Sequence, residues 1–171
     1  DIQKGENLSP EMRAKNPLGK IPILELDDGT CIAETDAICT YFEALQPEPP
    51  LMGKTPVEKG IISMWQRQVE LAFMMQVGMC FQHTTGYFKD RMVPVPEYGE
   101  QAGINAAKYL SILERRLANN EYIAGDHFSI ADITAVCAID FARVVKIRIR
   151  EDHTHLQRWY DAITHRASAK A

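Results

Sequence analysis

Residues 16–36 read NPLGKIPILELDDGTCIAETD, and this stretch decides the fold of the first part of the chain. Asp28-Gly29 stands between two apolar runs, Ile21–Leu26 and Cys31–Ala33. A tight reversal of the chain needs a positive φ, which glycine adopts without steric cost, so the stretch predicts a β-hairpin. Because Pro22 has no N–H to donate to a sheet, we expect it at the start of the first strand.

Short helices are expected on both sides of this hairpin. Ser9-Pro10 is a typical helix opening, with a capping serine followed by proline at the first helical position. Glu34–Asp36 opens a second helix, in which large side chains recur at i, i+3, i+4 and i+7. This spacing predicts one buried helix face, made of Ile38, Tyr41, Phe42 and Leu45.

A proline-rich segment then divides the chain. Three of the four residues 47–50 are proline, which makes a stiff linker. We therefore place a first domain at 1–46, a linker at 47–55 and a second domain at 56–171. Everything after the linker has helical spacing. The predicted fold class is α+β, with a partial α/β domain followed by an all-α domain.

Two segments of the helical domain carry the main predictions about its core. The segment 102–117 is expected to bury four aliphatic residues, which are Ile104, Ala107, Ile112 and Leu117. The segment 130–145 is apolar almost all round, as is typical of a central helix. Ser129 and Asp132 stand before it in the S-x-x-D pattern of a capping box, and we interpret this pair as structural.

Composition excludes several kinds of partner. The net charge of −4 over 171 residues offers no basic field for nucleic acid. The four cysteines form no C-x-x-C pair and have no histidine at zinc spacing, so we expect free thiols in a reducing compartment and no metal. No signal peptide and no bilayer-length apolar run occur. We therefore expect a cytoplasmic address without a membrane partner.

Three motifs, in order and spacing, resemble those of the glutathione transferase superfamily in its bacterial cytosolic form. Residues 16–24 resemble N-P-x-G-x-V-P-x-L, residues 34–38 resemble E-S-x-A-I with Thr35 for the usual serine, and residues 128–133 resemble F-S-I-A-D-I. The resemblance implies a thioredoxin-like domain followed by an all-helical domain.

The resemblance also bears on where the chain begins. In the family, the first domain opens with a strand, a helix and a second strand, whereas this chain begins at Asp1 in a polar stretch that reads like the middle of a domain. We expect the missing strand-helix-strand unit upstream of residue 1, and the alternative is that the chain docks on something that completes the sheet. The family keeps its catalytic Ser, Tyr or Cys there, so the catalytic residue is left unknown.

A glutathione site in the first domain is implied by the same resemblance, with glutathione as co-substrate. Ile21, followed by a cis proline at Pro22, would pair its backbone with the ligand's cysteine like an added strand. Thr35, at a helix N-terminus, would attract a ligand carboxylate, and Glu34 would accept from the ammonium group. Lys20 would pair with a ligand carboxylate. The alternatives are a trans proline opening a strand, ordinary helix capping and a surface lysine.

The resemblance further implies a second-substrate pocket between the domains, and a homodimer. The pocket candidates are Phe73, Met74, Phe81 and Tyr87. For each of them the alternative is ordinary core or dimer packing. The family usually dimerises through the first two helices after the linker, and Met64, Trp65 and Gln68 would lie on or near that helix, with the face that the partner buries left open.

The implied function is that of a glutathione S-transferase acting in detoxification. Such an enzyme lowers the pKa of the glutathione thiol, so that a thiolate exists at neutral pH and attacks a small electrophile. Two alternatives stay open. One is a non-catalytic binding or regulatory protein on the same scaffold. The other is a glutathione-dependent isomerase, dehalogenase or disulfide reductase.

Overall fold

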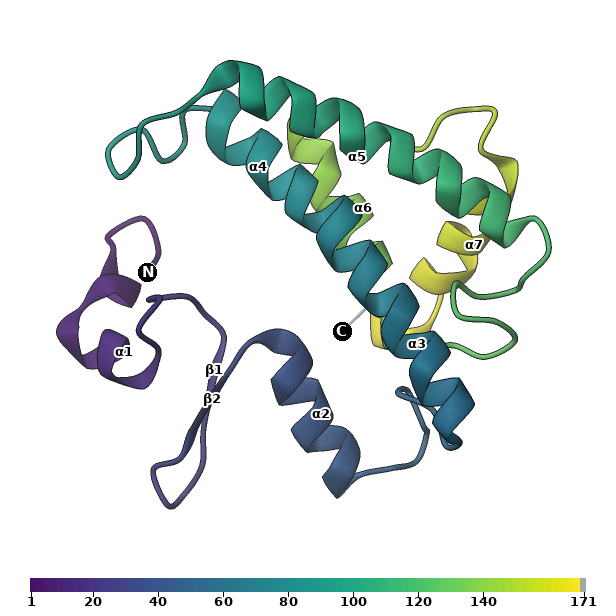
Figure 1. The fold of residues 1–171 in the computed structure, drawn as a ribbon, viewed down its shortest axis with the longest axis horizontal. Coiled ribbons are helices and arrows are strands. Elements are labelled where there is room, and N and C mark those ends of the chain that lie inside the picture. The colour runs from purple at the N-terminus through teal and green to yellow at the C-terminus, as the bar shows by residue number, and fades with distance from the viewer. Residues whose placement is uncertain (170–171) are drawn as a thin grey trace. The chain divides into compact units, whose positions relative to one another are not determined.

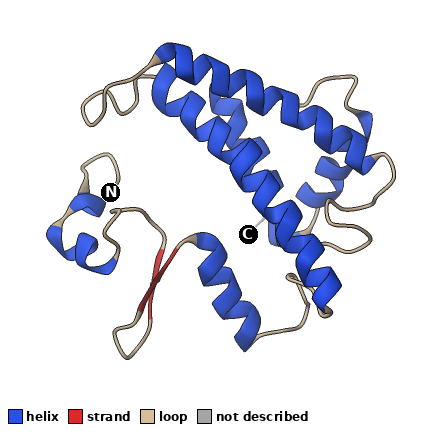
Figure 2. Ribbon diagram, in the orientation of Figure 1, coloured by secondary structure: helices blue, strands red, loops and turns tan. Residues whose placement is uncertain are grey.

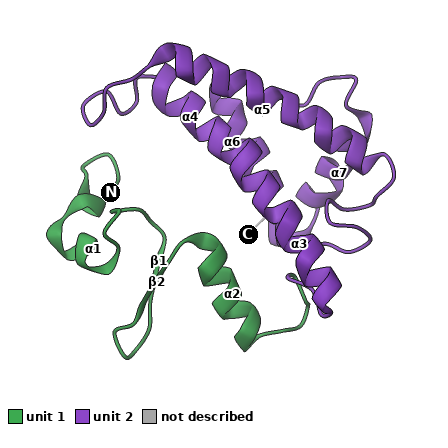
Figure 3. Cartoon of the chain, in the orientation of Figure 1, with its two compact units in different colours: residues 1–51 green, residues 52–171 purple. Residues whose placement is uncertain are grey.

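The computed structural model describes residues 1–169. They form two compact units, one covering Asp1–Leu51 and one beginning at Met52 (Figure 3). The first unit is a hairpin flanked by short helices, and the second is all-helical within the described residues (Figures 1 and 2). The α+β class predicted from the sequence is confirmed.

The first unit is built around the predicted hairpin. Its elements are η1 (Glu6–Leu8), α1 (Pro10–Lys15), β1 (Ile23–Glu25), β2 (Cys31–Ala33) and α2 (Thr35–Leu45). β1 and β2 pair antiparallel, with Ile23 opposite Ala33. Gly29 takes a φ of 85° in the reversal, and its N–H donates to the Leu26 carbonyl at 2.9 Å. The hairpin prediction is confirmed, and β1 begins one residue after Pro22.

The prediction that Ile38, Tyr41, Phe42 and Leu45 form a buried face of α2 is wrong. None of the α2 residues is buried, and Phe42 and Leu45 are exposed. Within the described residues, the only sheet has two strands of three residues each. A ladder of that size cannot cover a row of four large side chains.

The second unit packs helices around one core. Its elements are α3 (Pro56–Val69), η2 (Glu70–Met74), α4 (Met75–Thr84), α5 (Pro96–Leu117), α6 (Ile130–Ala142), η3 (Arg143–Val145), α7 (Thr154–Thr164) and η4 (Ala167–Ala169). α3, η2 and α4 follow one another without a break as a single long rod, whose α4 part lies beside α5 and whose α3 part packs on α6 (Figure 1). η2 is π-helical, because the Met75 N–H donates five residues back to the Glu70 carbonyl.

The core of this unit draws on every long helix. It contains Val69, Phe73 and Val77 from the long rod, Tyr109, Leu110, Leu113 and Leu117 from α5, Ala131, Ala135, Ala138, Ile139 and Ala142 from α6, and Leu156, Trp159 and Ile163 from α7. The expectation that α6 is buried all round is corrected, because Ile133, Cys137 and Asp140 are exposed on one side. α6 buries an alanine-rich row and keeps an open face.

The buried face of α5 differs from the one predicted. Leu117 is buried as expected, but Ile104 is 50% exposed and Ala107 and Ile112 are also exposed. Small residues decide which side of α5 faces α4. A Cβ atom on Gly99 would come within 2.8 Å of the His83 Cβ, and one on Gly103 within 3.0 Å of the Cys80 Sγ. Because the helices approach this closely, the bulky isoleucines point outward.

A buried carboxylate joins α6 to α7 and to the loop before α6. Asp132 is fully buried, and its Oδ1 accepts from the Ile123 N–H at 2.9 Å and from the Trp159 Nε1 at 2.8 Å. Its Oδ2 accepts from the Ser129 N–H at 3.0 Å and from the Ser129 hydroxyl at 3.1 Å. Ser129 and Asp132 form a capping box at the start of α6. Burial raises the pKa of the Asp132 carboxyl, and these four donors oppose the rise.

Tyr109 is a second polar group enclosed by the core. Its ring stacks on Phe73, with ring centroids 5.9 Å apart and planes 12° from parallel. Its hydroxyl is buried and has no hydrogen-bond partner among the described residues. Burial raises the pKa of Tyr109 to about 12.

We expect Asp132→Ala to lower the free energy of unfolding by at least about 3 kcal/mol, measured by urea denaturation. The change leaves the N–H groups of Ile123, Ser129 and Trp159 buried without an acceptor, and each such group costs about 1–3 kcal/mol. Asp126→Ala is the matched control. It removes the same charge from an exposed loop position and should change stability by no more than about 0.5 kcal/mol. Equal losses in the two variants would contradict the role given to Asp132.

We expect Tyr109→Phe to match or exceed the wild-type stability at neutral pH, because it keeps the stack on Phe73 and removes an unpaired hydroxyl. The raised pKa sets the pH dependence. Between about pH 10 and pH 12 the unfolded chain releases the Tyr109 proton while the folded protein retains it, so wild-type stability falls as pH rises through this window.

The advantage of Tyr109→Phe over the wild type should therefore grow above about pH 10. Urea unfolding at neutral and alkaline pH measures it. Tyr98→Phe, at an exposed tyrosine, serves as the control. A constant difference between Tyr109→Phe and the wild type across this range would show that Tyr109 ionises normally in the folded state.

Candidate functional site

The turn that leads into β1 is held by side-chain amides. The Asn16 Nδ2 donates to the Lys20 carbonyl at 2.9 Å, and its Oδ1 accepts from the Leu18 N–H at 3.1 Å. The Gly19 N–H donates to the Asn16 carbonyl at 2.8 Å. Gly19 has a φ of 61°, a conformation that glycine adopts without strain. The chain therefore enters Ile21 from a fixed turn.

Ile21 offers an open backbone edge after this turn. The Ile21–Pro22 peptide bond is cis, so that prediction is confirmed. Ile21 is 50% exposed and precedes the first strand residue by two positions. Among the described residues, neither its N–H nor its carbonyl takes part in a backbone hydrogen bond. An extended peptide can pair with such an edge.

Glu34 and Thr35 follow β2 at the start of α2. Glu34 occupies the N-cap position with a φ of 71°, which is uncommon for a residue other than glycine. Neither side chain caps the helix, and both residues are exposed. The first N–H groups of α2, an eleven-residue helix, thus have no side-chain acceptor within the described part of the chain.

The hairpin brings these two segments to the same end of its ladder. Because Ile23 pairs with Ala33, the residues just before β1 and just after β2 are neighbours in the register. All five residues predicted to bind glutathione lie there, namely Lys20, Ile21, Pro22, Glu34 and Thr35. Lys20 is exposed. The site thus combines a backbone edge, a cation and a helix N-terminus.

The four residues predicted for a second-substrate pocket do not form one group. Phe73 is fully buried against Tyr109, which is the core packing given above as the alternative. Met74 is exposed. Phe81 and Tyr87 do lie together, with ring centroids 5.3 Å apart.

Two phenylalanines that the sequence analysis missed complete this group. Phe81 also contacts the rings of Phe88 and Phe141, at 6.0 Å and 5.4 Å between centroids. We call these four residues, Phe81, Tyr87, Phe88 and Phe141, the aromatic cluster. Phe88 adjoins Tyr87 in sequence, a signal that was available, whereas Phe141 comes from α6, far along the chain.

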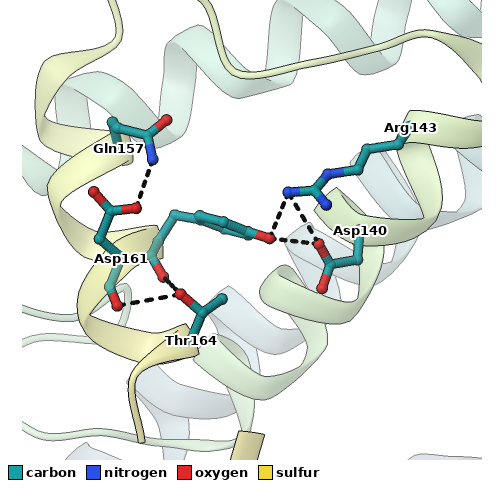
Figure 4. Close-up of polar contacts among 6 residues, drawn as sticks. Asp140, Arg143, Gln157, Asp161 and Thr164 are labelled. Carbon is teal, nitrogen blue, oxygen red and sulfur yellow. Dashed lines mark hydrogen bonds and ion pairs between the residues drawn. The ribbon is translucent and has the colours of Figure 1, made fainter. Parts of the chain in front are cut away.

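A polar cluster next to Phe141 joins the end of α6 to α7 (Figure 4). The Tyr160 hydroxyl donates to Asp140 Oδ1 at 2.5 Å and accepts from Arg143 Nη2 at 2.7 Å. Burial and the bond to Asp140 raise the pKa of Tyr160, so the hydroxyl keeps its proton. The same turn of α6 carries Phe141, so these bonds fix the end of the helix that supports the aromatic cluster.

An exposed apolar stripe runs along the α3–η2–α4 rod. It consists of Val57, Ile61, Met64, Leu71 and Met75, all exposed. With Gln68 in the middle, these residues recur at intervals of four, three, four, three and four. Trp65 faces the core instead, and Arg116 lies over its ring at 4.9 Å. Of the three residues predicted on or near the helix that dimerises in the family, Met64 and Gln68 are exposed and Trp65 is half-buried.

Two family models match the chain. The N-terminal domain of glutathione S-transferase matches residues 1–50, and the C-terminal domain of glutathione S-transferase matches residues 79–167. Glutathione S-transferase 2 of Saccharomyces cerevisiae is 39% identical over 172 residues, covering 99% of this chain and 74% of the relative. The chain belongs to the glutathione S-transferase family.

Solved structures place the chain in the same family. The crystal structure of Gtt2 from Saccharomyces cerevisiae superposes with a TM-score of 0.95 at 39% identity, over 99% of this chain and 83% of that one.

A translation protein is also similar in sequence. Elongation factor 1-gamma 2 of Oryza sativa is 30% identical over 157 residues, which are 90% of this chain but 36% of that relative. Within residues 1–169, every helix falls short of the length and apolar character that a bilayer crossing requires.

Proposed function

We propose that this protein conjugates the thiolate of glutathione to small electrophiles. The observation that carries the proposal is the hairpin register, which sets Lys20–Pro22 beside Glu34–Thr35 at one end of the β1–β2 ladder. Glutathione is a tripeptide with two carboxylates, one ammonium group and a thiol. It needs a backbone edge and an anion-binding corner next to each other, and this end of the hairpin supplies both.

Each residue of the site has a distinct part in binding. The open N–H and carbonyl of Ile21 pair with the cysteine of glutathione, as an added strand would. Thr35 and the uncapped N–H groups of α2 receive a carboxylate, helped by the helix dipole. Glu34 accepts from the ammonium group. Lys20 pairs with the other carboxylate.

The electrophile is proposed to rest on the aromatic cluster. Tyr87 is exposed and its ring lies 5.3 Å from Phe81, so an apolar molecule can cover both without disturbing the core. Dispersion contacts with aromatic faces hold flat apolar molecules of many shapes. The thiolate of glutathione then attacks the electrophilic atom, and the leaving group departs with its electron pair. We assign the activation of the thiol to none of the described residues.

Non-catalytic binding is the second candidate. The observation in its favour is the 30% identity to elongation factor 1-gamma 2 of Oryza sativa over 90% of the chain. Under this reading, the scaffold binds a partner without turning over an electrophile. Conjugation of chlorodinitrobenzene to glutathione, followed by absorbance, distinguishes the two.

We expect saturating glutathione to raise the melting temperature of the full-length protein. A ligand at about 100 times its Kd adds about 2.7 kcal/mol to the folded state. Thr35→Ala should weaken glutathione binding by about tenfold or more, since it removes a hydrogen bond to a charged group. Calorimetry gives both affinities.

The control for this variant is Thr40→Ala. It makes the same chemical change further along α2, where the hydroxyl donates to the Asp36 carbonyl at 2.9 Å, and should leave glutathione affinity unchanged. A Thr35→Ala variant that binds glutathione as tightly as the wild type would remove Thr35 from the site.

A homodimer, a cytoplasmic location and a role in detoxification complete the proposal. The exposed stripe on α3, η2 and α4 supports the dimer, because a row of five large apolar side chains is costly to leave in water. The four cysteines are all free in the structure, which fits a reducing compartment.

We expect Leu71→Glu to convert the dimer into monomers, because it places a charge within the apolar stripe. Light scattering coupled to size-exclusion chromatography measures the mass. Ile104→Glu places the same charge on an exposed residue of α5 and should leave the dimer intact. A wild-type protein that runs as a monomer at micromolar concentration would refute the dimer.

A further inference from the structure

The turn before Ile21 is held from two separate parts of the chain. Asn16 is 5% exposed and holds the Lys20 carbonyl from within the turn. The Asn7 Nδ2 donates to the Gly19 carbonyl at 2.6 Å, from twelve residues upstream. Two successive carbonyls, those of Gly19 and Lys20, are therefore each bound by a side-chain amide.

Asn7 and Leu8 also contact this turn closely. A Cβ atom on Gly19 would lie 2.9 Å from the Leu8 Cδ2 and 3.1 Å from the Asn7 carbonyl oxygen, so the two segments touch where only glycine fits. The peptide planes of residues 19 and 20 are thus fixed by hydrogen bonds and by close contact. The Ile21 N–H lies in the same peptide plane as the Lys20 carbonyl, so its direction follows from these contacts, and the Ile21 carbonyl begins the next peptide plane along the chain.

We propose that Asn7 and Asn16 are positioning residues for glutathione. They hold the Gly19 and Lys20 peptides so that the backbone edge of Ile21 stays open and correctly oriented for the cysteine of the ligand. Strand-like pairing uses an N–H and a carbonyl together, and a small rotation of the edge lengthens both bonds. The inference rests on the proposed function, since it concerns how that same site binds glutathione.

The hydrogen bonds of Asn7 distinguish positioning from simple stabilisation. Its Nδ2 is bonded, but its Oδ1 is buried and has no partner among the described residues. An amide that gains one bond and leaves one buried acceptor unpaired adds little net stability. Removing Asn7 should therefore disturb the turn more than it weakens the fold.

The decisive experiment is Asn7→Ala in the full-length protein. We expect the calorimetric Kd and the KM for glutathione to rise about three- to tenfold, because a misaligned Ile21 edge loses about the free energy of one hydrogen bond to the ligand. The KM for chlorodinitrobenzene and the kcat at saturating glutathione should stay at the wild-type values. The melting temperature should move by no more than about 2 °C.

Two further variants make the result specific. Asn120→Ala removes an equivalent bond, from Asn120 Nδ2 to the Arg116 carbonyl at 2.8 Å, in the helical unit, and should leave the Kd for glutathione unchanged. Asn16→Asp keeps the acceptor for the Leu18 N–H and loses the donor to Lys20, so it should weaken glutathione binding as Asn7→Ala does. If Asn16→Asp does not fold, Asn7→Ala decides alone.

The possible outcomes test the positioning role of Asn7 and the proposed function separately. A wild-type Kd in Asn7→Ala overturns the positioning role while leaving the glutathione site in place. An equal rise in Kd for Asn7→Ala and Asn120→Ala also overturns it, because the effect would then come from general loosening of the protein. A wild-type protein that fails to bind glutathione refutes the proposed function itself.

Discussion

The carboxylate of Asp132 is the contact on which the helical unit depends. Three parts of the chain donate to it: the loop at Ile123, the helix start at Ser129 and the indole of Trp159 on α7. A buried carboxylate is tolerated only when its oxygens are fully bonded, so these parts have to be in place together. Their arrangement sets the direction of α6, whose far end carries Phe141 to the aromatic cluster.

In the first unit, the structure depends on the turn before Ile21 and not on a buried charge. Nothing in this unit is large enough to form a core of its own, and its order comes from hydrogen bonds along the backbone. The hairpin register fixes which residues meet at the end of the ladder, and the amides of Asn7 and Asn16 fix the peptide planes there. The first unit is thus ordered by a turn and a strand register, and the second by a buried core.

Local patterns predicted local structure well. Asp28-Gly29 marked the reversal, and the S-x-x-D pattern marked the capping box, because each depends on only a few neighbouring residues. Patterns whose outcome depends on packing against another segment of the chain were less informative. Large aliphatics such as Ile104 suggested the wrong face of α5, since the close approach of α4 is made possible by small residues such as Gly99. The contact between Phe81 and Phe141 joins distant segments, and no single-sequence signal connects them.

The π-helical segment Glu70–Met74 acts as a phase shift in the long rod. An α-helix turns by about 100° per residue, so one additional residue in a turn rotates everything after it by more than a quarter of a circle. The rod can therefore present Ile61 and Met64 on one side and still aim Phe81 at Phe141 further along. The surface that carries Ile61 and Met64 and the surface that carries Phe81 therefore share one continuous element, and the added residue sets the angle between them.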